Sequence, residues 1–155
     1  MSHRSKQILV LCGVSLLLSA GLFFGQQVIQ TQSHNTAEGV EVDLTSLEIQ
    51  NNIVTVKFKL RNTAAQKQNV VIYFKDSYIM DEVNQKKYYG LKDTDGLYIA
   101  GPASDDNSGG RFWYNIEPGK SMGLWIKFPQ PTDSPASITI SLPGVSPFEN
   151  VKLAK

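Results

Sequence analysis

The stretch IVTVKFKLR, residues 53–61, decides the fold class of this chain. One set of its alternate positions is apolar: Val54, Val56, Phe58 and Leu60. The intervening set is polar: Thr55, Lys57, Lys59 and Arg61. Side chains repeat every two residues along a β-strand, so this pattern predicts a strand with one face in a core and one in water.

Similar segments lie on both sides of this strand. Residues 40–44 alternate in the same way, and Gln50-Asn51-Asn52 joins the two as a hairpin turn because Asn tolerates a positive φ. The segment 69–74 is apolar at nearly every position, which predicts a central strand with both faces covered. Residues 78–80 either continue this strand or start the next, and further strands are expected at 86–91, 97–100, 111–116, 121–128, 137–142 and near Val151.

The connections between these segments favour an antiparallel sheet structure. Residues 117–120 read Glu-Pro-Gly-Lys, a turn sequence with proline preset for the second position. Residues 129–135 cross between strands, and 101–110 form the longest expected loop. About eight or nine short strands without an amphipathic helix predict an all-β, antiparallel β-sandwich, with a small barrel as the alternative.

Charge and cysteine content exclude some functions. The 155 residues carry 15 basic and 14 acidic side chains, and two of the basic ones, Arg4 and Lys6, precede the β-region. The remainder is therefore close to neutral, which predicts no binding to nucleic acid. Cys12 is the single cysteine, so no disulfide forms within the chain.

An apolar segment opens the chain. Residues 8–25, ILVLCGVSLLLSAGLFFG, contain no charge, and a helix of this length spans about 27 Å, close to the hydrocarbon core of a bilayer. The preceding Arg4 and Lys6 should stay in the cytoplasm and place the rest of the chain outside. The sequence thus predicts a single-pass protein of the bacterial inner membrane, with its C-terminal domain in the periplasm or outside.

Two other fates remain open for this segment. It could be a signal peptide that is cut after Gly21, which would release a secreted protein, although Leu22, Phe23 and Phe24 extend the apolar run past that point. A lipoprotein cut at Cys12 is the third alternative. Residues 26–39 are polar and without periodicity, which predicts a tether. The expected organisation is therefore an anchor or signal at 1–25, a tether at 26–39 and a β-sandwich domain at 40–155.

The order of features between about 40 and 153 resembles the immunoglobulin-like extracytoplasmic domain of bacterial lipoproteins and secreted antigens. The resembling segments are 54–60 ending in Asn62, Tyr88 to Leu91 with Asp93-Thr94-Asp95-Gly96, Pro118-Gly119, Trp125 to Pro129, and Pro143-Gly144-Val145 with Pro147-Phe148. This resemblance implies an immunoglobulin-like sandwich outside the cytoplasm and brings no common catalytic residues.

Catalytic and metal-binding patterns are weak. Both histidines, His3 and His34, precede the expected domain, so it lacks the base of a Ser–His–Asp triad and the ligands of a histidine zinc site. We predict no enzyme and no cofactor, with a hydrolase built on a carboxylate pair as the remote alternative. Asp93 and Asp95 begin like a calcium loop but lack its distal ligands, which favours a hairpin turn with Gly96 at positive φ.

The aromatic residues suggest a binding face. By the parity of their strands Trp113 and Trp125 point outward, and the same parity would turn Tyr88 and Tyr98 outward. If the strands on either side of the 117–120 turn form a hairpin, the two tryptophans are neighbours. A covering loop is the alternative. We therefore expect a module for protein–protein interaction in the bacterial envelope, or a module that binds a small ligand or glycan through this face.

Overall fold

A computed structural model describes residues 27–103 and 110–153. These residues form eleven strands and one 3₁₀ helix: β1 (Gln30–Ser33), β2 (Val40–Gln50), β3 (Ile53–Asn62), β4 (Gln68–Tyr73), η1 (Phe74–Asp76), β5 (Tyr78–Asp81), β6 (Lys86–Tyr89), β7 (Ala100–Gly101), β8 (Arg111–Ile116), β9 (Ser121–Pro129), β10 (Ser137–Ser141) and β11 (Phe148–Lys152). The all-β prediction is confirmed, but the described residues form eleven strands where eight or nine were expected. The apolar helix expected at 8–25 lies outside the described residues, and within them no helix has the length and apolarity needed to cross a membrane.

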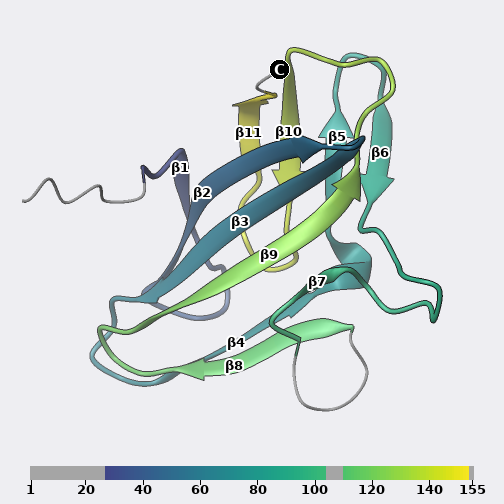
Figure 1. The fold of residues 1–155 in the computed structure, drawn as a ribbon. Coiled ribbons are helices and arrows are strands. Elements are labelled where there is room, and N and C mark those ends of the chain that lie inside the picture. Colours follow the sequence, from purple (N-terminus) through teal and green to yellow (C-terminus); the bar gives the residue numbers. More distant parts are fainter. Residues whose placement is uncertain (1–26, 104–109, 154–155) are drawn as a thin grey trace, which may run out of the picture.

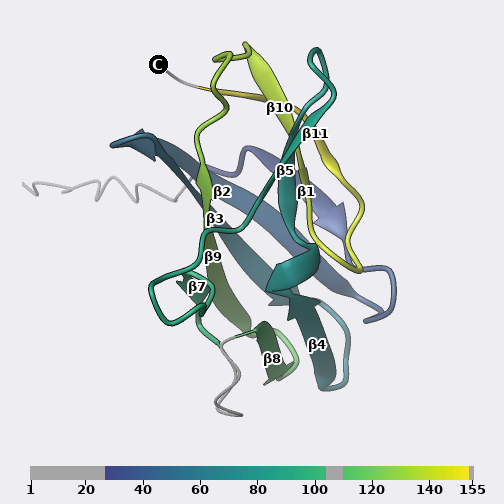
Figure 2. The same cartoon turned by 90° about the vertical axis from the view of Figure 1, so that its right-hand side faces the viewer.

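The strands form two layers. One layer is a five-stranded antiparallel sheet in the order β1-β2-β3-β9-β7. The other holds a four-stranded sheet, β11-β10-β5-β6, and a separate ribbon of β4 and β8 (Figures 1 and 2). All pairs are antiparallel, so the coarse prediction of an antiparallel, sandwich-like β-fold is confirmed.

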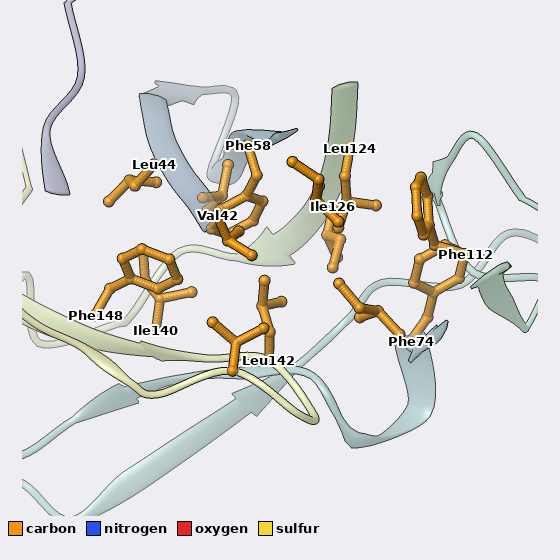
Figure 3. Close-up of a cluster of buried hydrophobic side chains, with 14 of the residues drawn as sticks. Val42, Leu44, Phe58, Phe74, Phe112, Leu124, Ile126, Ile140, Leu142 and Phe148 are labelled. Carbon is orange, nitrogen blue, oxygen red and sulfur yellow. The ribbon is translucent and has the colours of Figure 1, made fainter. Parts of the chain in front are cut away.

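The core lies between these layers (Figure 3). The apolar residues of β3 that define the alternating stretch are each 2% exposed or less: Val54, Val56, Phe58 and Leu60. From the opposite layer the Phe148 ring packs on Phe58, with 5.5 Å between ring centroids. Alternation in the sequence therefore predicted the buried face of this strand correctly.

A corner at Asn62 creates the separate ribbon. β3 and β9 pair as far as Arg61 and Ser121, and the pairing resumes in β4 and β8 at Gln68 and Ile116. Between these points the chain bends, and the buried Asn62 side chain holds the bend by donating to the carbonyls of Gln66 and Ile116, each at 2.8 Å. The bend folds the ribbon below β9 and β7 in the view of Figure 1.

This corner makes the prediction of a central strand at 69–74 wrong. β4 pairs with β8 on one side, and the sheet order gives it no partner on the other. Val70 and Ile72 are buried, whereas Tyr73 on the other face is 41% exposed. The ribbon thus covers the core with one face and presents the other to solvent.

The turns predicted at 50–52 and 117–120 both form. Asn51 and Asn52 have φ values of 52° and 61°, the left-handed conformation that a two-residue hairpin needs. In the 117–120 turn the Lys120 N–H donates to the Glu117 carbonyl at 3.0 Å, and Gly119 has a φ of 68°.

The expected tether at 26–39 is wrong for its described part. β1 pairs with β2 from Gln30 opposite Leu44 to Ser33 opposite Glu41. The side-chain amides of Gln30 and Gln32 donate to the carbonyls of Glu149 and Pro147 near β11, which joins the two layers at this edge. The polar residues in this segment hold a strand in place, so the folded domain includes β1.

Candidate functional site on the outer sheet face

The two tryptophans point outward but lie in different layers. Trp113 on β8 is 46% exposed and Trp125 on β9 is 37% exposed. β8 pairs with β4 and β9 pairs with β3 and β7, so the predicted hairpin between β8 and β9 does not form. The corner at Asn62 and the 117–120 turn carry the two strands into separate sheets. The prediction that the indoles are neighbours is therefore wrong.

Tyr88 and Tyr98 do not point outward, and the expected cluster of four aromatic rings is absent from the described residues. Both rings are partly buried and pack against the core. Tyr88 lies opposite the buried Ile79 in the register of β6, so Tyr88 shares its inward face. Tyr98 lies in an irregular segment before β7, where strand parity does not apply, and it meets Phe74 edge to face at 6.4 Å.

A groove with a volume of about 420 Å³ opens on the outer face of the five-stranded sheet. Gly123 on β9 leaves the hollow because it has no side chain, and a β-carbon there would have only the Phe58 carbonyl near it, at 4.0 Å. Strand β2, on the other side of β3 from β9, is irregular between Leu44 and Ser46, which places Thr45 out of register at the edge of the groove. A missing side chain and a β-bulge thus make the concavity together.

The Trp125 indole forms one wall of the groove. It lies against the backbone of β7, because a β-carbon on Gly101 would come within 3.0 Å of Cζ2 and 3.1 Å of Nε1 of the indole. Gly101 is also the register partner of Trp125. The short strand β7 therefore fixes the ring beside the groove.

Ion pairs organise the rest of this face. Arg61 binds Asp43 through two bonds, Nε to Oδ2 at 2.5 Å and Nη2 to Oδ1 at 2.9 Å, and Thr31 donates to the same carboxylate at 2.7 Å. The hydrogen bond from Arg61 lowers the pKa of Asp43 below its usual value. Lys57 pairs with Glu48 at 2.7 Å, and that hydrogen bond lowers the pKa of Glu48. These carboxylates are therefore ionised and engaged.

A second surface lies on the outer face of the β4–β8 ribbon, and we call it the Trp113 surface. Its members face one another in three register pairs: Asn69 with Asn115, Val71 with Trp113, and Tyr73 with Arg111. The Arg111 guanidinium lies 4.4 Å from the Trp113 ring centre, and the Lys75 ammonium lies 5.9 Å from that of Tyr73. The Trp113 indole N–H donates to Asn69 Oδ1 at 3.1 Å.

Sequence reasoning found Trp113 and missed Tyr73. The sequence pattern predicts two apolar faces for residues 69–74, whereas Tyr73 is an outward residue beside a cation. The Tyr73 hydroxyl and the flanking Lys75 are the signals that could have marked this face as solvent-facing.

The sequence Asp93-Thr94-Asp95-Gly96 forms a turn. Asp93 Oδ1 accepts the N–H groups of Asp95 and Leu97, at 3.0 and 2.9 Å, and Gly96 has a φ of 81°. Across residues 27–103 and 110–153, no three His, Cys, Asp or Glu side chains gather as a metal site would require.

His34 belongs to the folded domain, contrary to the sequence-based prediction. It is 7% exposed, and its Nδ1 accepts the N–H groups of Thr36 and Ala37 at 3.3 and 3.1 Å. Burial lowers the pKa of this imidazole. With Nδ1 bonded to backbone and the ring covered, His34 caps the segment that follows it and offers no base to a substrate.

Comparisons with protein-family models, curated proteins and solved structures find no match for this chain. Function is therefore argued from the two surfaces themselves.

Proposed function

We propose that this chain is an extracytoplasmic binding module that holds a saccharide in the groove beside Trp125. One observation carries the proposal: an exposed indole, fixed by Gly101, stands beside a 420 Å³ hollow on an otherwise regular sheet face. Sugar rings present C–H groups on their faces, and these pack well on the electron-rich face of an indole. Lys59 and Ser121 at the rim offer hydrogen-bonding groups for sugar hydroxyls.

The form of the groove favours one or two units of a polymer. Sites for free small molecules usually enclose most of the ligand surface. This groove is open on a sheet face, so a chain of sugars can lie across it with one ring against Trp125.

The proposed setting is the bacterial envelope. Residues 8–25 would anchor the chain in the inner membrane and place the domain in the periplasm or outside, or would be removed from a secreted form. The resemblance to immunoglobulin-like extracytoplasmic domains supports this setting, and the antiparallel sandwich-like fold fits that class. A module at this place meets the polysaccharides of the envelope.

Calorimetry with matched tryptophan variants tests the proposal. The full chain in nonionic detergent is titrated with soluble polysaccharides, some neutral, some carboxylated and some phosphorylated. We expect Trp125→Ala to lose the binding that the parent shows and Trp113→Ala to keep it. Both indoles are exposed, so Trp113→Ala removes a comparable aromatic ring from the surface and serves as the control for Trp125→Ala. Absence of binding by the parent to every polymer would refute the proposal.

A protein partner at the Trp113 surface is the second candidate function. Trp, Tyr and Arg are the residue types that most often dominate the energy of protein–protein interfaces, and here Trp113, Tyr73 and Arg111 share one face. In crosslinking within intact envelopes, Trp113→Ala should then remove a specific adduct that Trp125→Ala retains. An adduct that persists in Trp113→Ala and disappears in Trp125→Ala would count against a protein partner at the Trp113 surface.

A further inference from the structure

Resting on the proposed saccharide site, we infer that its ligand is anionic: a sugar ring that bears a carboxylate or phosphate, with the negative group on Lys59. The charged side chains of the groove favour such a ligand, which the shape of the groove alone does not select.

The groove has basic side chains without acidic ones. Lys57 and Lys59 line it, and no Asp or Glu is among the described residues that do so. Lys57 is neutralised by Glu48 at 2.7 Å. Lys59 is exposed, and the ion pairs found among residues 27–103 and 110–153 do not include it.

Asp43 interacts with Lys59 through its charge but forms no contact ion pair with it. Asp43 lies opposite Lys59 in the register of β2 and β3, but its side chain is only 3% exposed. Both of its oxygens already accept hydrogen bonds, from Arg61 and Thr31. Glu41, which faces Arg61, is also paired with that residue, at 2.7 Å. Among the described residues no carboxylate is therefore in direct contact with the Lys59 ammonium, and its N–H groups remain available to a ligand.

The spacing between Trp125 and Lys59 fits one sugar ring that bears an anionic group. Gly123 lies opposite Lys59, and Trp125 lies opposite Lys57. Two residues along a strand cover about 7 Å. A sugar ring on the indole can thus extend a carboxylate or phosphate over Gly123 to the Lys59 ammonium, where a charge-assisted hydrogen bond forms.

Paired polymers that differ only in charge test this inference. Polygalacturonate is compared with its methyl ester, and a phosphorylated mannan with the same mannan after phosphate removal. The two comparisons also show whether the bound anionic group is a carboxylate or a phosphate. We expect at least one acidic polymer to bind the full chain about 10-fold more tightly than its neutral partner, with weakening at high salt.

Lysine variants locate the charge. Lys59→Gln should remove about 10-fold of the affinity for the acidic polymer and weaken binding of the neutral polymer far less, because the Gln amide still donates hydrogen bonds to sugar hydroxyls. Lys59→Arg should retain the affinity for both polymers. Lys152→Gln is the matched control, since Lys152 is an exposed strand lysine on β11 in the other layer. An equal loss in both glutamine variants would mean nonspecific charge attraction and overturn the inference.

The two proposals fail differently. If neutral and acidic partners bind the parent equally through Trp125, the anionic ligand is wrong and the saccharide site stands. If no polymer binds, the saccharide site itself is wrong.

Discussion

Gly101 lies directly against the indole of Trp125, and any β-carbon at residue 101 would come within 3.0 Å of the ring. Because Gly101 sits on the neighbouring strand β7, the backbone of one strand sets the orientation of an aromatic side chain on the next. Displacement of the indole should therefore weaken ligand binding, although less than its removal does.

Gly101→Ala should displace Trp125 without unfolding the domain. We expect saccharide affinity to fall by roughly 2- to 10-fold, the worth of an aromatic contact. The chain has two tryptophans, so in a Trp113→Phe background the fluorescence reports on Trp125 alone. A red-shifted emission in Gly101→Ala would show the displaced ring. Unchanged emission and affinity would mean that β7 does not position the indole.

Phe58 should be the most sensitive position of β3. It is 2% exposed and packs on Phe148 of the opposite layer, so Phe58→Ala leaves a cavity between the layers. We expect a loss of about 3–5 kcal/mol in the free energy of unfolding, measured with denaturant. Lys59→Ala, on the outer face of the same strand, should change it by less than about 0.5 kcal/mol. Equal losses would contradict the register of this strand.

The parts of the fold that local patterns govern could be predicted from the sequence. Alternation alone identified the buried face of β3, and Asn51-Asn52 identified the hairpin turn. The bend at Asn62 could not be foreseen, because its hydrogen bonds reach Ile116, 54 residues away. The same long-range bend separated Trp113 from Trp125 and moved β4 out of the central position.

The missed first strand has a related cause. Gln30 and Gln32 alternate as strand residues do, but their partners are the Glu149 and Pro147 carbonyls at the far end of the chain. A segment whose polar side chains hydrogen-bond to distant backbone has the same composition as a flexible tether, so the sequence alone does not distinguish the two. The groove was missed for a similar reason, since Gly123 makes a hollow only when its neighbours on β3 are known.

Acid should destabilise the domain through Asp43. The hydrogen bond from Arg61 lowers the pKa of Asp43 from its usual value of 3.8. A carboxyl whose pKa is lower in the folded state stabilises the fold above pH 3.8, and this stability is lost as the pH falls through the folded pKa. Unfolding midpoints between pH 6 and 2 should therefore fall less steeply in Asp43→Asn than in the parent.

At pH 7 the stability of Asp43→Asn measures the contribution of the Asp43–Arg61 ion pair. Asp43→Asn should cost about 1–3 kcal/mol there, because it weakens hydrogen bonds to a charged group. Glu48→Gln is the control, since the Glu48–Lys57 pair is solvent-exposed and should contribute little. Parallel pH profiles for the parent and Asp43→Asn would show that Asp43 does not control acid stability.

His34 should add a second, higher pH step. Burial lowers the pKa of its imidazole below 6.5, so folding keeps the ring neutral and stability begins to fall as the pH drops below about 6.5. Asn can accept the N–H groups of Thr36 and Ala37 in place of Nδ1 but does not titrate. His34→Asn should thus abolish the stability change between pH 7 and 5, whereas His3→Asn should preserve it.

Gly123 offers the most direct control over the groove. Its φ is not among the positive values, and a β-carbon there would have only the Phe58 carbonyl near it, at 4.0 Å, so a side chain can be added without backbone strain. They also suit a strand better than glycine does. The series Gly123→Ala, Gly123→Val and Gly123→Ile should therefore keep or raise the free energy of unfolding while saccharide affinity falls with each added methyl group. Calorimetry and denaturant unfolding on the same samples separate the two effects. Retained affinity in a stable Gly123→Ile variant would show that the ligand does not enter this groove.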